Sequence, residues 1–235
     1  MKYGGKFFLN PFAIVLALIA LFTSAPIFAQ QKPIVIEANV VGDAATKAIS
    51  TINKSGSFVL SRNIVNSRSG FVALQVNASN VTIDLQGFTI SGTSVTGAGI
   101  NAAGQSNIVI RNGIVTGCGG PAIVTGNSAN ISAITASQNS TSGGAGPSIQ
   151  AGNGSQLISN GVSASGAGGI SCGVGCLAAS NVIQGNTGVG LSFLDDTGGY
   201  VGNVLQGNDA SSVGSTGQVS GGISLGQNLC NGTAC

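Results

Sequence analysis

A repeat of about 22 residues constrains the fold of this chain more than any other feature of its sequence. The segments ASNVIQGN and VGNVLQGN end at Asn186 and Asn208, so their equivalent residues lie 22 positions apart. A second series consists of apolar residues that mostly follow small ones, at spacings of 23, 26, 21, 21 and 32: Ile100, Ile123, Ile149, Ile170, Leu191 and Ile223. Self-similarity of this period is the signature of a stacked-repeat protein.

Within each repeat, short runs alternate between apolar and polar residues, as in VTIDL from Val81 to Leu85, and turns rich in Gly, Asn and Ser separate them. A period of two residues is typical of strands, and no helical period persists after Asn53. We therefore predict an all-β fold, a parallel β-helix (a solenoid) of about seven coils with three short strands each and with capped ends. One coil cannot bury its apolar face alone, so stacked coils form the core.

The chain divides into four parts. Residues 1–29 combine a positively charged start with an apolar stretch from Pro11 to Phe22, as in a cleaved secretory signal. That stretch is shorter than the roughly 20 residues of a membrane span, although an uncleaved N-terminal anchor is the alternative. Residues 30–69 are predicted to hold an N-terminal capping segment and the first strands, residues 70–228 the coils, and residues 229–235 a C-terminal cap. Residues 43–52 fit either a short capping helix or an extended capping strand.

Asparagines recur at one phase of the repeat. Asn160, Asn181 and Asn203 lie 21 and 22 residues apart, and each precedes an apolar residue by two positions. Residues of equal phase stack on neighbouring coils, so the side-chain amides could bond one another from coil to coil. We interpret this ladder as structural rather than as a binding site.

Two motifs carry a resemblance to known proteins. At NVTIDLQGFTISG (Asn80 to Gly92) and SNIVIRNGIVTG (Ser106 to Gly117) the chain resembles a bacterial family of secreted right-handed parallel β-helix proteins, which share the overall architecture of pectate lyases. The resemblance extends from Ser55 to Cys235. It implies a right-handed solenoid and says little about activity, because most such members have no assigned function and a fold alone does not settle function.

The chain contains no His and few charged residues, which narrows the possible functions. Lys and Arg number 8 against 6 Asp and Glu, and Lys2 and Lys6 lie in the predicted signal. This near-balance excludes a basic nucleic-acid-binding surface, because phosphate binding needs clustered Lys and Arg. Without His, the usual general base and the commonest zinc ligand are missing.

Carboxylates on stacked coils can share a site only if they are adjacent in sequence or one repeat apart. Glycoside hydrolases need two such carboxylates, and calcium-dependent lyases need several. Only Asp195 and Asp196 are neighbours, and their segment LDDTGG is also typical of a solvated turn. We interpret the pair as a turn, with a calcium site as the alternative, and predict no catalytic residues, no other metal ligands and no cofactor. Arg111 is explained by an ion pair or by hydrogen bonds to a turn.

Five cysteines fit an exported protein. Cys172 and Cys176 are separated by Gly-Val-Gly, and Cys230 and Cys235 enclose Asn-Gly-Thr-Ala in the predicted cap, so both pairs are disulfide candidates. We interpret the remaining Cys118 as a small buried residue in a turn.

These observations favour an exported, non-enzymatic β-helix that is secreted, periplasmic or at the cell surface. Its expected role is structural or adhesive, or a weak contact to polysaccharides or cell-surface glycans. A carbohydrate-active enzyme, either a polysaccharide lyase or a hydrolase, is the alternative. An ice- or surface-binding rod needs ranks of Thr at coil spacing, and only Thr89 and Thr116 lie in this way. We expect no nucleic-acid partner and no stable membrane span after processing.

Overall fold

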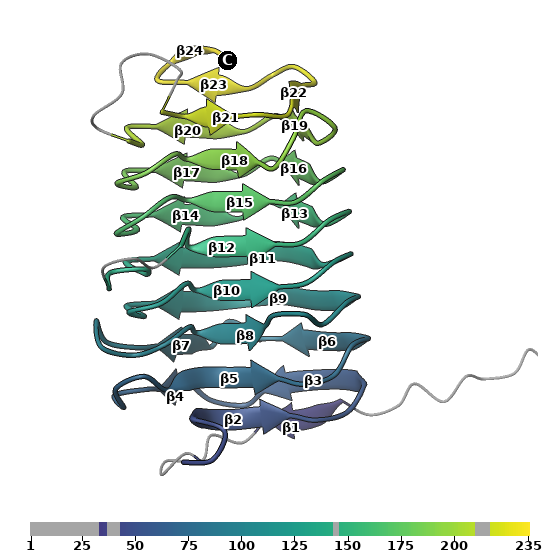
Figure 1. Ribbon diagram of the computed structural model, residues 1–235, viewed down its shortest axis with the longest axis vertical. Coiled ribbons are helices and arrows are strands. Elements are labelled where there is room, and N and C mark those ends of the chain that lie inside the picture. Colours follow the sequence, from purple (N-terminus) through teal and green to yellow (C-terminus); the bar gives the residue numbers. More distant parts are fainter. Residues whose placement is uncertain (1–32, 37–42, 143–145, 210–216) are drawn as a thin grey trace, which may run out of the picture. The chain divides into compact units, whose positions relative to one another are not determined.

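The computed structural model describes residues 33–36, 43–142, 146–209 and 217–235. In these residues every regular element is a β-strand, and the strands form a parallel β-solenoid of eight turns (Figure 1). The predicted all-β stacked fold is confirmed, with one turn more than the seven expected. The predicted secretory signal, residues 1–29, lies outside the described residues. No described helix has the length and apolarity that crossing a membrane requires.

Each turn contributes one strand to an eight-stranded sheet. In order along the stack its strands are β2 (Ala48–Ile52), β5 (Val72–Val76), β8 (Ile100–Ala102), β10 (Ile123–Thr125), β12 (Ile149–Ala151), β15 (Ile170–Cys172), β18 (Leu191–Phe193) and β21 (Val219–Ser220).

The other two sides of each turn belong to a sixteen-stranded sheet that bends into two limbs. The first limb contains β1 (Ile34–Ile36), β3 (Gly56–Leu60), β6 (Val81–Asp84), β9 (Ile108–Thr116), β11 (Asn130–Ser137), β13 (Gln156–Ile158), β16 (Leu177–Ala179), β19 (Gly199–Val201) and β22 (Ile223–Ser224). The second limb contains the later halves of β9 and β11 together with β4 (Ile64–Val65), β7 (Thr89–Ser91), β14 (Gly161–Ser163), β17 (Val182–Gln184), β20 (Val204–Gln206), β23 (Leu229–Cys230) and β24 (Thr233–Ala234). Of the paired strands described, only β23 and β24 are antiparallel, and they form a hairpin on the last turn.

The first turn corrects one expectation. Residues 43–52 form a turn and then strand β2, so the capping-helix alternative is wrong. Asp43 opens the turn by accepting a hydrogen bond from the Ala45 N–H at 2.9 Å. Pairing with β5 buries Ile49 and Ile52 against the core. A helix here would leave the backbone of β5 without a parallel neighbour on this side.

The apolar series of the sequence marks the inner face of the eight-stranded sheet. Ile100, Ile123, Ile149, Ile170 and Leu191 are in register on successive strands and are fully buried. The last member was misassigned, because Val219 and not Ile223 pairs with Leu191. In the earlier turns a small residue precedes the apolar one, whereas Gln218 precedes Val219 and is itself buried. Each fully buried aliphatic side chain of such a row contributes about 1.5–3 kcal/mol through apolar burial.

A column of residues with positive φ forms the bend between the two limbs. Its members in successive turns are Asn112, Ala133, Ser159, Ser180 and Gly202, with φ between 52° and 63°. One residue with positive φ interrupts the alternation of inward- and outward-facing side chains and turns the chain sharply. Each limb of a turn can therefore consist of a strand of only three residues. A second column follows the second limb and consists of Gln138, Ala164, Gly185 and Gly207.

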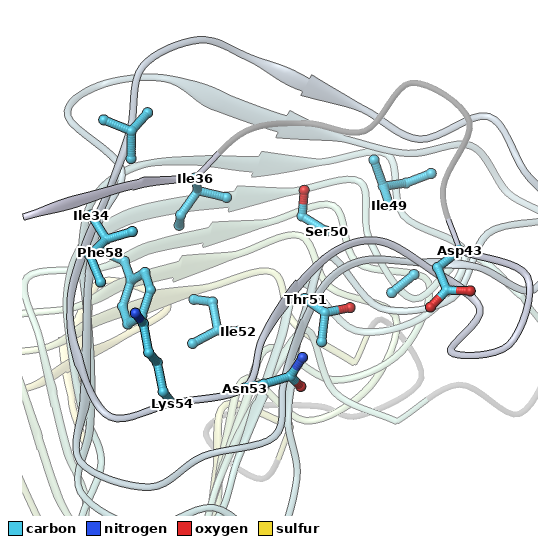
Figure 2. Close-up of a pocket in the computed structure, with 12 residues that line it drawn as sticks. Ile34, Ile36, Asp43, Ile49, Ser50, Thr51, Ile52, Asn53, Lys54 and Phe58 are labelled. Atoms are coloured by element: carbon cyan, nitrogen blue, oxygen red, sulfur yellow. The ribbon is translucent and has the colours of Figure 1, made fainter.

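The N-terminal end of the stack holds a cavity of about 660 Å³. Strands β1, β2 and β3 line it with mainly aliphatic and aromatic side chains, including Ile36, Ile52 and Phe58, and Asp43 and Lys54 are also part of its lining (Figure 2). Among the described strands, β2 has a neighbour only on the side of β5.

Candidate functional site

The loop after β18 contains Asp195 and Asp196. Oδ1 of Asp195 accepts hydrogen bonds from the Thr197 N–H at 3.0 Å and from the Thr197 hydroxyl at 2.7 Å. The oxygen of that hydroxyl in turn accepts a hydrogen bond from the Gly175 N–H, one turn earlier, at 2.9 Å. This is an Asx turn tied to the preceding coil. In the described part of the chain no three His, Cys, Asp or Glu residues gather into a group that could hold a metal ion.

Arg111 and Asp84 form an ion pair between adjacent turns, with Nε of Arg111 3.0 Å from Oδ2 of Asp84. Burial by itself would raise the pKa of Asp84. Hydrogen bonds from the Gln86 N–H and from the Arg111 and Asn112 side chains outweigh that effect, so the pKa is lowered. Asp84 is therefore ionised near neutral pH and cannot serve there as a general acid.

The ion pair and the Asp195 loop are far apart along the stack. Arg111 lies in the third turn and Asp195 follows the strand of the seventh, and four turns of a parallel sheet span about 19 Å. Proton transfer needs contact within about 3 Å. The two sets of charged groups therefore cannot act on one bond of a substrate.

The structure brings Asn160, Asn181 and Asn203 into one buried row just after the bend between the limbs. Nδ2 of Asn160 donates to Oδ1 of Asn181 at 3.0 Å, and Nδ2 of Asn181 donates to Oδ1 of Asn203 at 3.0 Å. Asn203 continues the row by donating to Asn228, also at 3.0 Å. Each Nδ2 also donates to a backbone carbonyl, such as that of Leu157 for Asn181. The amides are thus fully engaged inside the stack.

A second buried row follows the outer end of the second limb and was not predicted. Nδ2 of Asn186 donates to Oδ1 of Asn208 at 2.7 Å, and Nδ2 of Asn208 donates to Oε1 of Gln218 at 2.8 Å. The sequence carried a signal for it, because Asn186 and Asn208 lie 22 residues apart and each follows a Gly, as Asn203 does. Gln218 closes the row by donating back to the carbonyl of Asn208 at 2.9 Å.

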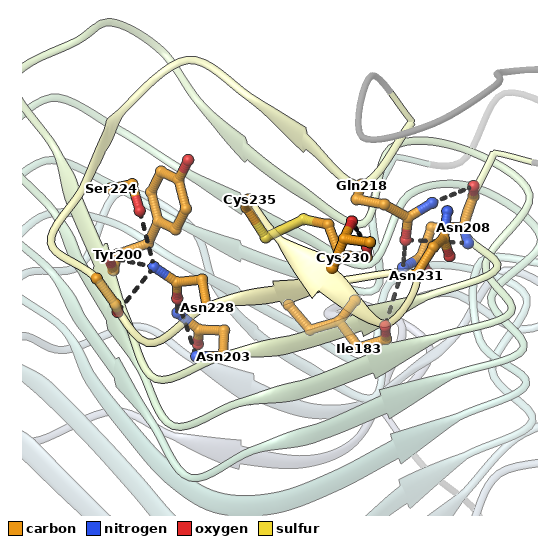
Figure 3. The surroundings of a disulfide bond; sticks show 12 residues. Ile183, Tyr200, Asn203, Asn208, Gln218, Ser224, Asn228, Cys230, Asn231 and Cys235 are labelled. Carbon is orange, nitrogen blue, oxygen red and sulfur yellow. Dashed lines mark hydrogen bonds between the residues drawn. A yellow bond between two sulfur atoms is a disulfide. The ribbon is translucent and has the colours of Figure 1, made fainter.

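The four candidate cysteines form two disulfides, Cys172–Cys176 and Cys230–Cys235. The second links Cys230 of β23 to Cys235, directly after β24, and so closes the hairpin of these two strands. Figure 3 shows it between the ends of the two amide rows, at Asn228 and at Gln218. Two disulfides are typical of a protein in an oxidising compartment.

Cys118 is a free, buried cysteine. Burial raises the pKa of its thiol to about 12. It is therefore protonated at physiological pH and lacks the thiolate that nucleophilic or metal-binding chemistry requires.

The outer face of the eight-stranded sheet carries a row of mostly polar side chains. In register from the second turn to the eighth these are Gln75, Asn101, Val124, Gln150, Ser171, Ser192 and Ser220. Nδ2 of Asn101 donates to Oε1 of Gln75 at 3.0 Å. All are at least partly exposed, because they alternate with the buried apolar row of the same strands.

A shallow groove of about 330 Å³ lies on this face over the fourth to sixth turns. Gln150 and Ser171 from the polar row, Asn153 from the following corner and Leu194 from the loop after β18 contribute to its lining. Leu194 is 74% exposed and is anchored by its N–H, which donates to the carbonyl of Cys172 at 3.0 Å. None of the lining residues is charged. The groove can offer hydrogen bonds from amides and hydroxyls and the aliphatic surface of Leu194.

Comparison of the chain with protein-family models, with curated proteins and with solved structures gave no match.

Proposed function

We propose that this chain is an exported, non-enzymatic β-solenoid with a structural or adhesive role at the cell surface, which contacts neutral glycans weakly through the outer face of its eight-stranded sheet. The observation that carries this proposal is the uncharged groove, in which Gln150 and Ser171 of adjacent turns line the same hollow as the exposed Leu194. Amide and hydroxyl groups bond sugar hydroxyls, and an aliphatic side chain packs on the apolar face of a sugar ring.

Export is supported by the two disulfides and by the charged and then apolar start of the sequence. The mature form should begin near Gln30. N-terminal sequencing of the exported protein checks this, and an intact Met1 on a membrane-bound form would contradict it.

Two motifs support a proposal for the family of this chain, in addition to its fold. NVTIDLQGFTISG contains β6 and β7, and SNIVIRNGIVTG contains β9, which pairs with both of them in the next turn. A right-handed solenoid of pectate-lyase-like architecture is accordingly our proposal for the family and the handedness. An experimental structure would test both.

A glycan array probed with the mature protein, with and without calcium, tests the binding proposal. We expect weak binding to neutral polysaccharides, independent of calcium, which the double substitution Gln150→Ala and Ser171→Ala abolishes. Asn130→Ala with Gln156→Ala is the matched control, because these two polar residues also lie in register on adjacent turns but on the first limb. Binding that the control pair removes and the groove pair does not would contradict the proposed surface.

A lyase assay on polyuronates separates this function from the enzymatic alternative. Lyases release unsaturated products that absorb in the ultraviolet, and we expect no rise in absorbance with or without calcium. A rise in absorbance that disappears in the double variant Asp195→Ala/Asp196→Ala would contradict the non-enzymatic proposal. It would support both the lyase alternative and a calcium site at these two residues.

A further inference from the structure

Charged residues are segregated along the stack. The first turn and its junction with the second contain four basic residues and one acidic residue among those described: Asp43, Lys47, Lys54, Arg62 and Arg68. The seventh turn contains three acidic residues and no basic one: Asp195, Asp196 and Asp209. The charged residues between them are Asp84 and Arg111, which pair with each other. Lys32 and Glu37 in the sequence preceding the first turn leave this balance unchanged.

The N-terminal end combines this positive charge with apolar surface. Its cavity is lined by Ile34, Ile36 and Ile49, and Lys54 and Phe58 also belong to the lining (Figure 2).

The C-terminal end combines negative charge with exposed aliphatic residues. Ile223, Leu225 and Leu229 in the last turn are 54%, 59% and 46% exposed. Leu225 packs over Gly199 of the turn before, where an added Cβ would meet its Cδ1 at 2.8 Å. The Asp195 loop lies next to the last turn, since the N–H of Gly222 donates to the carbonyl of Asp195 at 3.2 Å.

We propose that a second copy of this chain docks its C-terminal end on the N-terminal end of the first. This arrangement joins the basic end to the acidic end and covers aliphatic surface on both. Contacts between two like ends would instead bring like charges together, which disfavours a symmetric pair. A head-to-tail contact of two different surfaces does not close on itself, so it produces open rows of copies.

Sedimentation of the mature protein over a range of concentrations tests the contact. At low ionic strength, near 0.01 M, charges interact over about 30 Å, whereas near 1 M the range falls to about 3 Å. We expect concentration-dependent association at low salt that weakens by about tenfold or more at high salt. A monomer at every concentration and salt would overturn the proposal.

Charge reversal identifies the surfaces. Lys54→Glu and Asp196→Lys change exposed side chains at the two ends, so the fold should persist, which circular dichroism verifies. Each variant alone should associate about tenfold or more weakly than the parent. An equal mixture of the two should associate more strongly than either variant alone, because one unaltered basic end then meets one unaltered acidic end.

A control variant at the middle of the stack completes the test. Gln156→Glu alters an exposed residue on the first limb in the fifth turn and should leave association unchanged. Association that Gln156→Glu abolishes, or that neither end variant weakens, would indicate side-by-side contact and overturn the end-to-end arrangement.

Discussion

Asn181 is surrounded by hydrogen-bond partners from both neighbouring turns. Its Oδ1 accepts from the N–H and Nδ2 of Asn160, and its Nδ2 donates to Leu157 and Asn203. Asn181→Ala leaves these buried groups without partners, and each unsatisfied buried group costs about 1–3 kcal/mol. We expect the free energy of unfolding to fall by an amount of that order, measured by guanidinium denaturation.

The matched control is Asn101→Ala on the outer face of the eight-stranded sheet. Asn101 also bonds an amide of the neighbouring turn, Gln75, but water can reach both groups. Its replacement should therefore change the stability by less than about 0.5 kcal/mol. If the two substitutions lowered the free energy of unfolding equally, the buried row of Asn side chains would not contribute specially to stability.

Cys118 should be inert in the folded protein. Its side chain is buried, and its pKa of about 12 leaves almost no thiolate at pH 8. A thiol-specific colorimetric reagent at pH 8 should detect one thiol per chain after denaturation and none before. Rapid labelling of the native protein would show that this site opens.

The same thiol makes stability depend on alkaline pH. Below about pH 9 the Cys118 thiol is protonated in both the folded and unfolded states, so it adds no slope. Between about pH 9 and 12 the unfolded chain loses the proton and the folded chain keeps it, so the free energy of unfolding falls by about 1.4 kcal/mol per pH unit. Cys118→Ala should lack this part of the slope, and parallel curves for the two proteins would contradict the assignment.

Among the elements of each turn, the strands were easier to predict from sequence than the corners. Equal spacing was enough to bring Asn160, Asn181 and Asn203 together, because parallel stacking preserves phase. The row of Asn186 and Asn208 has the same spacing and the same preceding small residue. Its next member, Gln218, follows Asn208 by only 10 residues, so the row departs from the period there. The Gly222–Ile223 step imitates the small-then-apolar signal, which explains the misassigned register.

Ala133 at the bend between the limbs offers a direct test of the corner geometry. It is exposed and has a φ of 52°, a conformation that costs a residue with a Cβ about 1–2 kcal/mol. Ala133→Gly should relieve this cost and raise the free energy of unfolding by up to about 1 kcal/mol, since glycine also gains entropy in the unfolded chain. The control Ala103→Gly, at an exposed alanine without positive φ, should lower it by about 0.5–1 kcal/mol.

At the scale of the whole stack, the sequence period was enough to predict the stacked architecture. It was not enough to predict the candidate groove. The groove depends on the loop after β18, where Leu194 follows the strand and lies near residues of the fourth to sixth turns. A repeat shows which residues share a phase; it does not show how a loop outside the repeat folds over them. Likewise, the separation of basic residues at one end from acidic residues at the other could be recognised only after each residue had been assigned to a turn.

Stacking also predicts how far the effect of a destabilising core substitution extends along the molecule. A solenoid is stabilised by contacts between neighbouring turns, so a residue in the middle supports two interfaces and a residue at an end supports one. Ile131 is fully buried in β11, which pairs with β9 and with β13 and β14, whereas Ile49 is buried in β2, which pairs with β5.

The substitution isoleucine to alanine is therefore expected to have unequal effects at these two positions. Ile131→Ala should lower the free energy of unfolding by about 2–5 kcal/mol and raise hydrogen exchange throughout the stack. Ile49→Ala should cost less than half as much and raise exchange only in peptides from the first two turns, because the remaining turns keep all their neighbours. Hydrogen-exchange mass spectrometry of both variants measures this, and equal, stack-wide effects would mean that the eight turns unfold as one unit.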